Sequence, residues 1–214
     1  MKLHNYFRSS ASFRVRIALA LKGIDYQYAS LHLAKGEHLK PEFQAFAAEG
    51  LVPVLELDDG QLLTQSMAII EYLDETHPAG APLLPADALG RARVRALSQI
   101  VACEIHPLNN LRVLKYVKNT LGAGEEAKNT WYRHWVAVGL TSFERQLHKG
   151  PQGRYCHGDQ PTMADCCLVP QIFNAQRLDC PLGDYPRTMA VFDACMQHPA
   201  FQAAQPSRCP DAEA

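Results

Sequence analysis

Residues 6–19 read YFRSSASFRVRIAL, and this stretch decides how the N-terminal part of the chain folds. It predicts that a short strand, Lys2 to Tyr6, runs directly into a helix that begins near Ser10 and ends near Gly23. Helix starts leave backbone N–H groups without partners and carry the positive end of the helix dipole, so they favour anions. Serines there can also act only as helix caps. Other motifs in the sequence are needed to show whether these serines only cap the helix or also bind an anion.

The overall composition excludes several classes of protein. The 214 residues carry a net charge of −1 and are 47% hydrophobic, which is typical of a globular protein with one large or two small domains. We therefore expect no nucleic-acid partner and no membrane association, and no apolar run approaches the roughly 18 residues of a membrane-spanning helix. The first residues do not resemble a signal peptide. The seven cysteines include no C-x-x-C pair, which favours reduced thiols, no metal site and a cytoplasmic location.

Residues 1–78 alternate strand and helix signals, and we expect one domain with the order βαβαββα. The helix near Ser10 should stop at Gly23, and Ser66 should cap a helix that runs to His77. The sequence Asp58-Asp59-Gly60 predicts a hairpin turn. The other elements are expected at Tyr26 to Leu31 (strand), Pro41 to Ala48 (short helix), Leu51 to Leu57 (strand) and Gln61 to Thr64 (strand).

Residues 79–86 are rich in proline and small residues and are expected to be a linker to a helical domain over 87–214. A long helix is predicted from Leu89 to Tyr116 with a bend near Pro107, and a second from Ala127 to His148. Thr162 should cap a third helix, with Asp165 reaching back to the N–H of the cap. We expect residues 205–214 to be disordered. The fold class is therefore an α/β domain followed by an all-α domain.

Five motifs in this order resemble the zeta class of the glutathione transferase superfamily, which includes maleylacetoacetate and maleylpyruvate isomerases. The motifs are RSSASFRVRIAL at 8–19, LVPVL at 51–55, QSMAIIEYL at 65–73, IHPLNNL at 105–111 and VPQIFNAQR at 169–177. The resemblance covers residues 1–200. It implies a thioredoxin-like N-terminal domain, an all-helical C-terminal domain, glutathione as cofactor, a small-molecule substrate and a homodimer.

The resemblance implies that glutathione binds along the N-terminal domain. Ser9, supported by Ser10 and the N–H near Ala11, would stabilise the glutathione thiolate, because a helix start with hydroxyl donors lowers the pKa of a thiol. Pro53 would be cis, so that the Val52 backbone pairs with the cysteinyl part of glutathione. The remaining implied contacts are Gln65 and Ser66 on the γ-glutamyl carboxylate, His38 near the glycyl carboxylate, and His106 near the same cofactor. His38 could equally be a solvated loop residue, and His106 a packed one.

The implied substrates, maleylacetoacetate or maleylpyruvate, are dianions and need local positive charge. Arg8, Arg112 and Arg177 could pair with their carboxylates, because guanidinium groups bind carboxylates in two-point geometry. Asn110 and its neighbour Asn109 are unusual in a helix interior, which favours a cleft. Arg14 and Arg16 are interpreted as structural or surface charges. The expected function is a glutathione-dependent cis–trans isomerisation of a maleyl keto acid to its fumaryl isomer, with Arg8, Ser9 and Ser10 as catalytic residues.

Three alternatives remain at this point. The chain could be a transferase that conjugates glutathione or dehalogenates α-halo acids, or a non-catalytic binding module with the same fold. A glutaredoxin-like reductase is disfavoured because Ala11 stands where many zeta enzymes have cysteine. Ala47-Ala48, where relatives usually have Asn-Pro, is a second departure. The sequence does not distinguish the two maleyl substrates.

Overall fold

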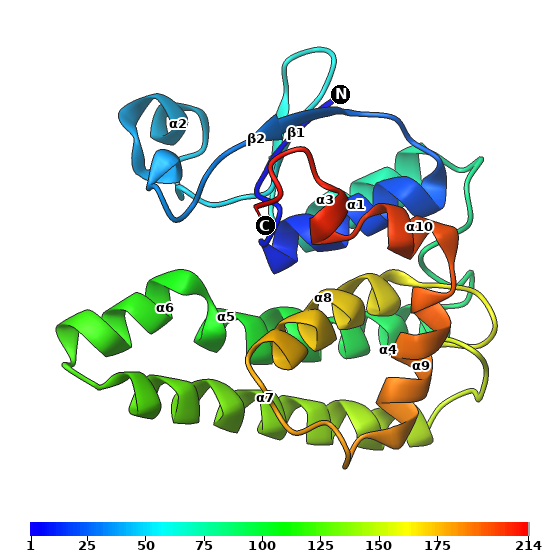
Figure 1. The fold of residues 1–214 in the computed structure, drawn as a ribbon. Helices are drawn as coiled ribbons and strands as arrows, with labels where there is room; N and C mark the ends of the chain where they lie inside the picture. The colour runs from blue at the N-terminus through cyan, green and yellow to red at the C-terminus, as the bar shows by residue number, and fades with distance from the viewer. Residues whose placement is uncertain (214) are drawn as a thin grey trace. The chain divides into compact units, whose positions relative to one another are not determined.

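A computed structural model describes residues 1–213, and its contacts divide the chain into two compact units (Figure 1). The first unit combines Met1–Leu83 with the C-terminal segment that begins at Met196, and the second is Leu84–Cys195. The expected boundaries, 1–78 and 87–214, differ from these units mainly at the C-terminal end. The difference arises because the C-terminal segment packs on residues of the first unit.

The first unit contains a mixed four-stranded sheet in the order β2-β1-β3-β4. The central strand β1 pairs in parallel with β2 and antiparallel with β3, so that Leu3 lies between Tyr28 and Leu55. The pair β3 and β4 is antiparallel. The strands are β1 (Lys2–Asn5), β2 (Gln27–Ser30), β3 (Val54–Glu56) and β4 (Leu62–Thr64). The predicted βαβαββα order is confirmed.

Helices cover both faces of this sheet. The helices α1 (Ser10–Lys22) and α3 (Ser66–Thr76) pack side by side on the face to which the fully buried Leu3 belongs (Figure 1). The next residue, His4, points to the opposite face, where its ring lies 4.6 Å from Phe46 of α2 (Pro41–Phe46). The short 3₁₀ helix η1 (Glu37–Leu39) precedes α2.

The C-terminal segment is ordered over residues 205–213, so the predicted disorder is wrong there; Ala214 lies outside the described residues. It contains α10 (Pro199–Ala203), which packs on α1, and the 3₁₀ helix η4 (Pro206–Arg208). Beyond η4, the Asp211 carboxylate accepts hydrogen bonds from the Tyr28 hydroxyl and, at 3.2 Å, from the Phe7 N–H. Burial and the bond to Asp211 raise the pKa of Tyr28. The anchoring partners lie about 180 to 200 residues earlier in the sequence, where no local pattern could reveal them.

The second unit is built almost entirely from helices. Helix α7 lies along η2 and α5, and α8 lies along α4 (Figure 1). Its elements are α4 (Ala88–Gln99), η2 (Ile100–Ile105), α5 (His106–Asn109), α6 (Leu111–Lys115), η3 (Tyr116–Thr120), α7 (Glu125–His148), α8 (Met163–Arg177) and α9 (Pro186–Met196). Within residues 1–213, no helix is both long and apolar enough to cross a membrane.

The predicted single helix from Leu89 to Tyr116 is instead interrupted. Two π-helical stretches, η2 and η3, flank the short helices α5 and α6, and the helical path breaks at Asn110, which has an extended backbone (ψ 163°). The expected bend at Pro107 is therefore displaced by three residues, since proline fits the first turn of a new helix. Gly139 of α7 lets η2 approach closely: a Cβ there would lie 2.1 Å from Ile105.

The start of α8 matches the predicted capping box. The Asp165 carboxylate accepts from the Thr162 N–H at 2.8 Å and from the Cys156 N–H at 2.9 Å, and Asp165 is fully buried. Burial raises the pKa of Asp165, while these hydrogen bonds act in the opposite direction. Asp165 thus connects the loop around Cys156 with the first turn of α8.

We expect Asp165→Ala to lower the free energy of unfolding by about 3 kcal/mol, because it removes a cap and leaves buried N–H groups without acceptors. Urea unfolding followed by circular dichroism measures this loss. Asp159→Ala is the matched control, since the exposed Asp159 accepts one backbone bond, from Arg154. Equal losses for the two variants would contradict the role of Asp165.

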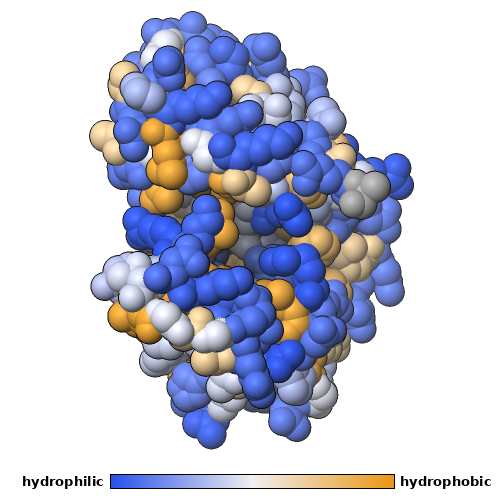
Figure 2. Space-filling model, turned by 60° about the vertical axis from the view of Figure 1, so that its left-hand side comes forward, coloured by the Kyte–Doolittle hydropathy of each residue, from blue (hydrophilic) through white to orange (hydrophobic). Residues whose placement is uncertain are grey.

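Hydrophilic side chains cover most of the face shown in Figure 2, and hydrophobic ones appear singly or in small groups. The large hydrophobic residues that are exposed include Leu89, at 83%, and Leu121, at 65%. Single exposed apolar residues of this kind are common on globular proteins.

Candidate functional site

The start of α1 brings hydroxyl and backbone N–H groups together. Ser9 is the N-cap, and its Oγ accepts a hydrogen bond from the Ser12 N–H at 3.2 Å. The N–H of Ala11 belongs to the first turn, whose N–H groups have no intrahelical carbonyl to bind. Because Ser9 Oγ accepts one bond, its own hydroxyl hydrogen can still be donated to an anion. Ser9 is partly exposed and Ser10 is buried, so Ser9 is the more accessible donor.

Arg8 lies beside this helix start but its guanidinium contacts the C-terminal segment. Nη2 of Arg8 donates to the Tyr6 hydroxyl at 2.9 Å, and Cζ lies 5.0 Å from the centre of the Phe7 ring. The same nitrogen is 3.7 Å from Oε2 of Glu213. A hydrogen bond from His32 and the charge of Arg8 lower the pKa of Glu213. A substrate carboxylate that binds Arg8 would therefore compete with Glu213.

The peptide bond between Val52 and Pro53 is cis, which confirms the expectation drawn from the resemblance. It immediately precedes β3, with Val52 half-buried and Pro53 buried. His38 lies in η1 and is half-buried. Gly50, at φ +58°, allows the chain to pass His38, since a Cβ at Gly50 would lie 3.0 Å from the His38 carbonyl oxygen.

The start of α3 combines a strained backbone with a buried cation. Gln65 occupies the cap position with φ +67°, which is rare for a residue other than glycine and concentrates at functional sites. Ser66 is the first residue of α3 rather than its cap, which corrects the prediction. Its Oγ accepts a hydrogen bond from Nη1 of Arg14 at 3.2 Å, and Arg14 is only 2% exposed.

In the second unit, the candidate residues lie around the short helices α5 and α6. His106 is half-buried and begins α5 directly after η2. Asn109 donates to the Tyr132 carbonyl at 3.1 Å, and Asn110 caps α6, with Oδ1 accepting from the Val113 N–H at 3.1 Å. Both asparagines therefore make hydrogen bonds that hold these helices, and the cleft expected from their position stays a prediction.

The two candidate substrate arginines of this unit are exposed. Arg112 lies on α6 and Arg177 is the last residue of α8. Arg177 is close enough to Tyr132 for its charge to counteract the rise in the pKa of Tyr132 that burial causes. Both guanidinium groups are accessible to a carboxylate.

Two residues that contact the candidate site or the chain beside it, Arg14 and Asp211, were not among the predicted site residues. Arg14 was interpreted as a structural or surface charge; it is buried and donates to Ser66, which agrees with the structural alternative. Asp211 holds the N–H of Phe7, two residues before Ser9. The arginine spacing in FRVRIAL could have suggested buried roles, since apolar residues flank both arginines. No pattern in the residues around Asp211 indicated its contacts with Phe7 and Tyr28.

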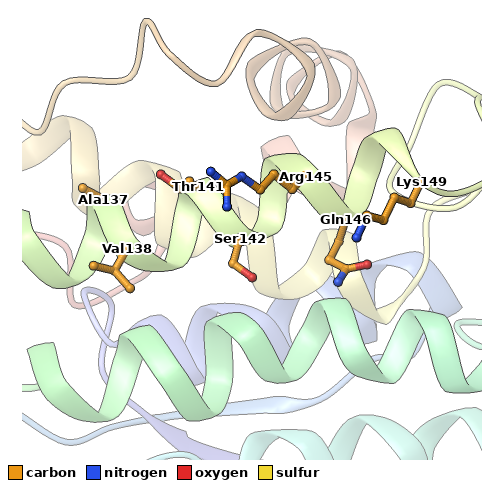
Figure 3. A pocket seen from close by; sticks show the side chains of 7 residues that line it. All are labelled: Ala137, Val138, Thr141, Ser142, Arg145, Gln146 and Lys149. Carbon is orange, nitrogen blue, oxygen red and sulfur yellow. The ribbon is translucent and has the colours of Figure 1, made fainter.

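A shallow depression of about 500 Å³ lies elsewhere, along α7 (Figure 3). Its lining residues all come from α7 and the residue that follows it: Ala137, Val138, Thr141, Ser142, Arg145, Gln146 and Lys149. None of the candidate residues above lines it. In residues 1–213, no group of three or more His, Cys, Asp or Glu side chains could hold a metal ion.

Similarity to known proteins extends over almost the whole chain. Residues 8–76 match the glutathione S-transferase N-terminal domain and residues 139–200 the C-terminal domain. The maleylpyruvate isomerase of a Ralstonia species is 50% identical over 99% of both chains. A holo structure of maleylpyruvate isomerase, a bacterial zeta-class enzyme, is 50% identical over the full length of both chains with a TM-score of 0.96.

A second solved structure shows a ligand. The maleylacetoacetate isomerase of Anaeromyxobacter dehalogenans, 44% identical with a TM-score of 0.88, contains dicarboxyethyl glutathione and citrate in its active site; the match covers 100% of this chain and 97% of that one. The chain therefore belongs to the glutathione S-transferase family and, within it, to the zeta class.

Proposed function

We propose that this protein is a glutathione-dependent cis–trans isomerase that converts a maleyl keto acid, maleylpyruvate or maleylacetoacetate, to its fumaryl isomer. The observation that carries the proposal is identity of 50% over nearly the whole length of a maleylpyruvate isomerase. The positions of Ser9, Val52-Pro53 and Gln65-Ser66 in the first unit support it, because they offer the groups that a tripeptide thiol requires.

The residues present fit glutathione. Two helix starts, those of α1 and α3, offer N–H and hydroxyl donors to a thiolate and to a carboxylate respectively. The residues that would bind glutathione are, in the first unit, Ser9, Ser10, Ala11, His38, Val52, Pro53, Gln65 and Ser66, and, in the second unit, His106. When bound, glutathione supplies a thiolate that acts as a covalent catalyst on the cis double bond. Ser9 would donate its hydroxyl hydrogen to the sulfur and keep it ionised.

The chain's cations would hold the substrate. Arg8, Arg112 and Arg177 would pair with its carboxylates, which orients the alkene and neutralises its charge. Asn110 uses Oδ1 to cap α6 and one Nδ2 hydrogen to bond the Pro107 carbonyl of α5, so its contribution would come from the remaining amide hydrogen.

We expect Arg177→Ala and Arg112→Ala to raise the KM for the maleyl substrate about tenfold or more, because each removes a charged hydrogen-bond donor. Glutathione affinity, measured by calorimetry, should stay within twofold of the wild type. Arg145→Ala is the matched control, since Arg145 is exposed on α7. If the variants lost glutathione affinity and substrate affinity to the same extent, these arginines would not be specific substrate-binding residues.

A coupled measurement of fumaryl product and glutathione tests the function itself. An isomerase forms product at constant glutathione concentration, whereas a conjugating or dehalogenating transferase consumes glutathione in proportion to product. Glutathione binding without turnover of either maleyl substrate would identify a binding module. The ratio of kcat/KM for maleylpyruvate and maleylacetoacetate then assigns the physiological substrate.

We also propose that the protein is a cytoplasmic homodimer. The resemblance supports the dimer, and sedimentation equilibrium tests it. The location is supported by the cysteines, since all seven are thiols within residues 1–213 and disulfides are rare in the cytoplasm.

A further inference from the structure

Arg14 connects the N-terminal part of α1 with the first residue of α3. It lies on α1, one turn after Ser10, and its Nη1 donates to Oγ of Ser66 at the beginning of α3. Arg14 is 2% exposed and Ser66 is 6% exposed. We infer that Arg14 is a positioning residue that acts through Ser66 and gives the protein its affinity for the γ-glutamyl carboxylate. This inference rests on the proposed use of glutathione.

The contact fixes the role of the Ser66 hydroxyl. A guanidinium group has only donors, so Oγ of Ser66 must be the acceptor in this bond. The hydroxyl hydrogen of Ser66 then points away from Arg14 and is available to a second acceptor. A carboxylate is such an acceptor, whereas an ammonium group is not. Arg14 thereby turns a serine that could donate or accept into a donor.

Charge at the start of α3 favours the same ligand. The eleven-residue helix α3 carries a partial positive charge at its N-terminus, where Ser66 lies, and the positively charged guanidinium of Arg14 donates to Ser66 at the same place. Two positive contributions in one place favour an anion. Because Arg14 is buried, salt screens its field less than that of a surface arginine.

Arg16, two residues further along α1, shows what a purely structural arginine looks like in this helix. Its guanidinium donates to the carbonyl oxygens of Ala204 and Phe7 and to the side chain of Asn5. Arg14 instead contacts the side chain of a residue that the family resemblance places on glutathione. None of these Arg16 contacts reaches a residue that the resemblance places on glutathione, whereas Nη1 of Arg14 does.

The test compares two thiols: glutathione and the dipeptide Cys-Gly, which lacks the γ-glutamyl group and has a free amine in its place. Isothermal titration calorimetry measures the Kd of each for the wild type, Arg14→Gln and Arg14→Lys. We expect Arg14→Gln to weaken glutathione about tenfold or more and Cys-Gly less than twofold, because only glutathione carries the carboxylate that Ser66 would bind. Arg14→Lys, which keeps the charge, should recover part of the loss. Arg208→Gln, an exposed arginine of the same unit, should change neither Kd.

A double-mutant cycle with Ser66→Ala tests whether Arg14 acts through Ser66. In the Ser66→Ala background, Arg14→Gln should cost clearly less glutathione affinity than in the wild type, since the hydroxyl that it positions is absent. At saturating glutathione, kcat should stay near the wild-type value while the KM for glutathione rises.

Equal weakening of both thiols, or full additivity in the cycle, would overturn the inference and leave Arg14 a structural residue. If Arg14→Gln does not fold, Arg14→Lys decides by the same comparison of the two thiols. A wild type that does not prefer glutathione to Cys-Gly would instead contradict the proposed function. The failures of the inference and of the function are thus distinguishable.

Discussion

Ser9→Ala is expected to lower kcat/KM for the maleyl substrate roughly 100-fold or more, the usual cost of removing one donor to a developing or bound anion. Ser9 is the cap of α1, it is partly exposed, and its Oγ already accepts the Ser12 N–H. Its remaining hydrogen is the one available to a glutathione sulfur. The pKa of bound glutathione, followed by the ultraviolet absorbance of the thiolate, should therefore rise in this variant.

Ser9→Gly separates the hydroxyl from the helix cap. Glycine caps helices almost as well as serine, so the free energy of unfolding should change by only a few tenths of a kcal/mol, whereas Ser9→Ala should lose about 1 kcal/mol. Both variants lack the hydroxyl and should lose similar activity. Ser12→Ala is the control, since Ser12 is fully buried and only its backbone N–H serves Ser9. Near-normal activity of Ser9→Ala together with a large loss in Ser10→Ala would move the role to Ser10.

The first helix could be predicted to the residue because its signals are local. Ser9 caps it, and Gly23, at φ +65°, ends it in the left-handed conformation that glycine adopts readily. The Thr162–Asp165 capping box is a second local signal, and it is also confirmed. The boundaries of a helix can be predicted from the sequence where they depend on capping side chains within about four residues of its ends.

Features that depend on distant packing could not be predicted in this way. The helical segment after Gln99 changes to a π-helix where Gly139 lets α7 approach Ile105, and these residues are more than thirty positions apart. The order of residues 205–213 depends on Tyr28 and Phe7 for the same reason.

The candidate site shows the same division. The cis bond before Pro53 was expected because a motif carries it, whereas the contact of Arg14 with Ser66 could not be predicted because burial of an arginine depends on the helix packed against it. The roles assigned to His38, His106, Arg112 and Arg177 remain predictions. Asn110 caps α6, so it has a structural role in addition to its proposed role in substrate binding.

Arg16→Met is expected to lower the free energy of unfolding by about 3 kcal/mol or more, because it leaves several buried oxygens without a hydrogen-bond donor. Arg16 is 2% exposed. Its Nε donates to the Ala204 carbonyl at 3.1 Å, Nη2 to the Phe7 carbonyl at 2.9 Å, and Nη1 to Asn5 Oδ1 at 3.1 Å. Methionine would fill much of the volume but would leave these buried oxygens without donors. Urea unfolding measures the loss.

The same variant should loosen the C-terminal segment, because Arg16 joins it to the end of β1. Hydrogen exchange of residues 199–213 should accelerate in Arg16→Met more than exchange in α7, which belongs to the other unit. Arg208→Met, an exposed arginine of the same segment, should change the free energy of unfolding by no more than about 0.5 kcal/mol. If Arg16→Met proved as harmless as Arg208→Met, Arg16 would not be the link between the C-terminal segment and the loop that leads to Ser9. Arg16→Lys separates the charge from the hydrogen bonds: lysine keeps the positive charge but reaches fewer of these oxygens, so it should lose an intermediate amount of stability.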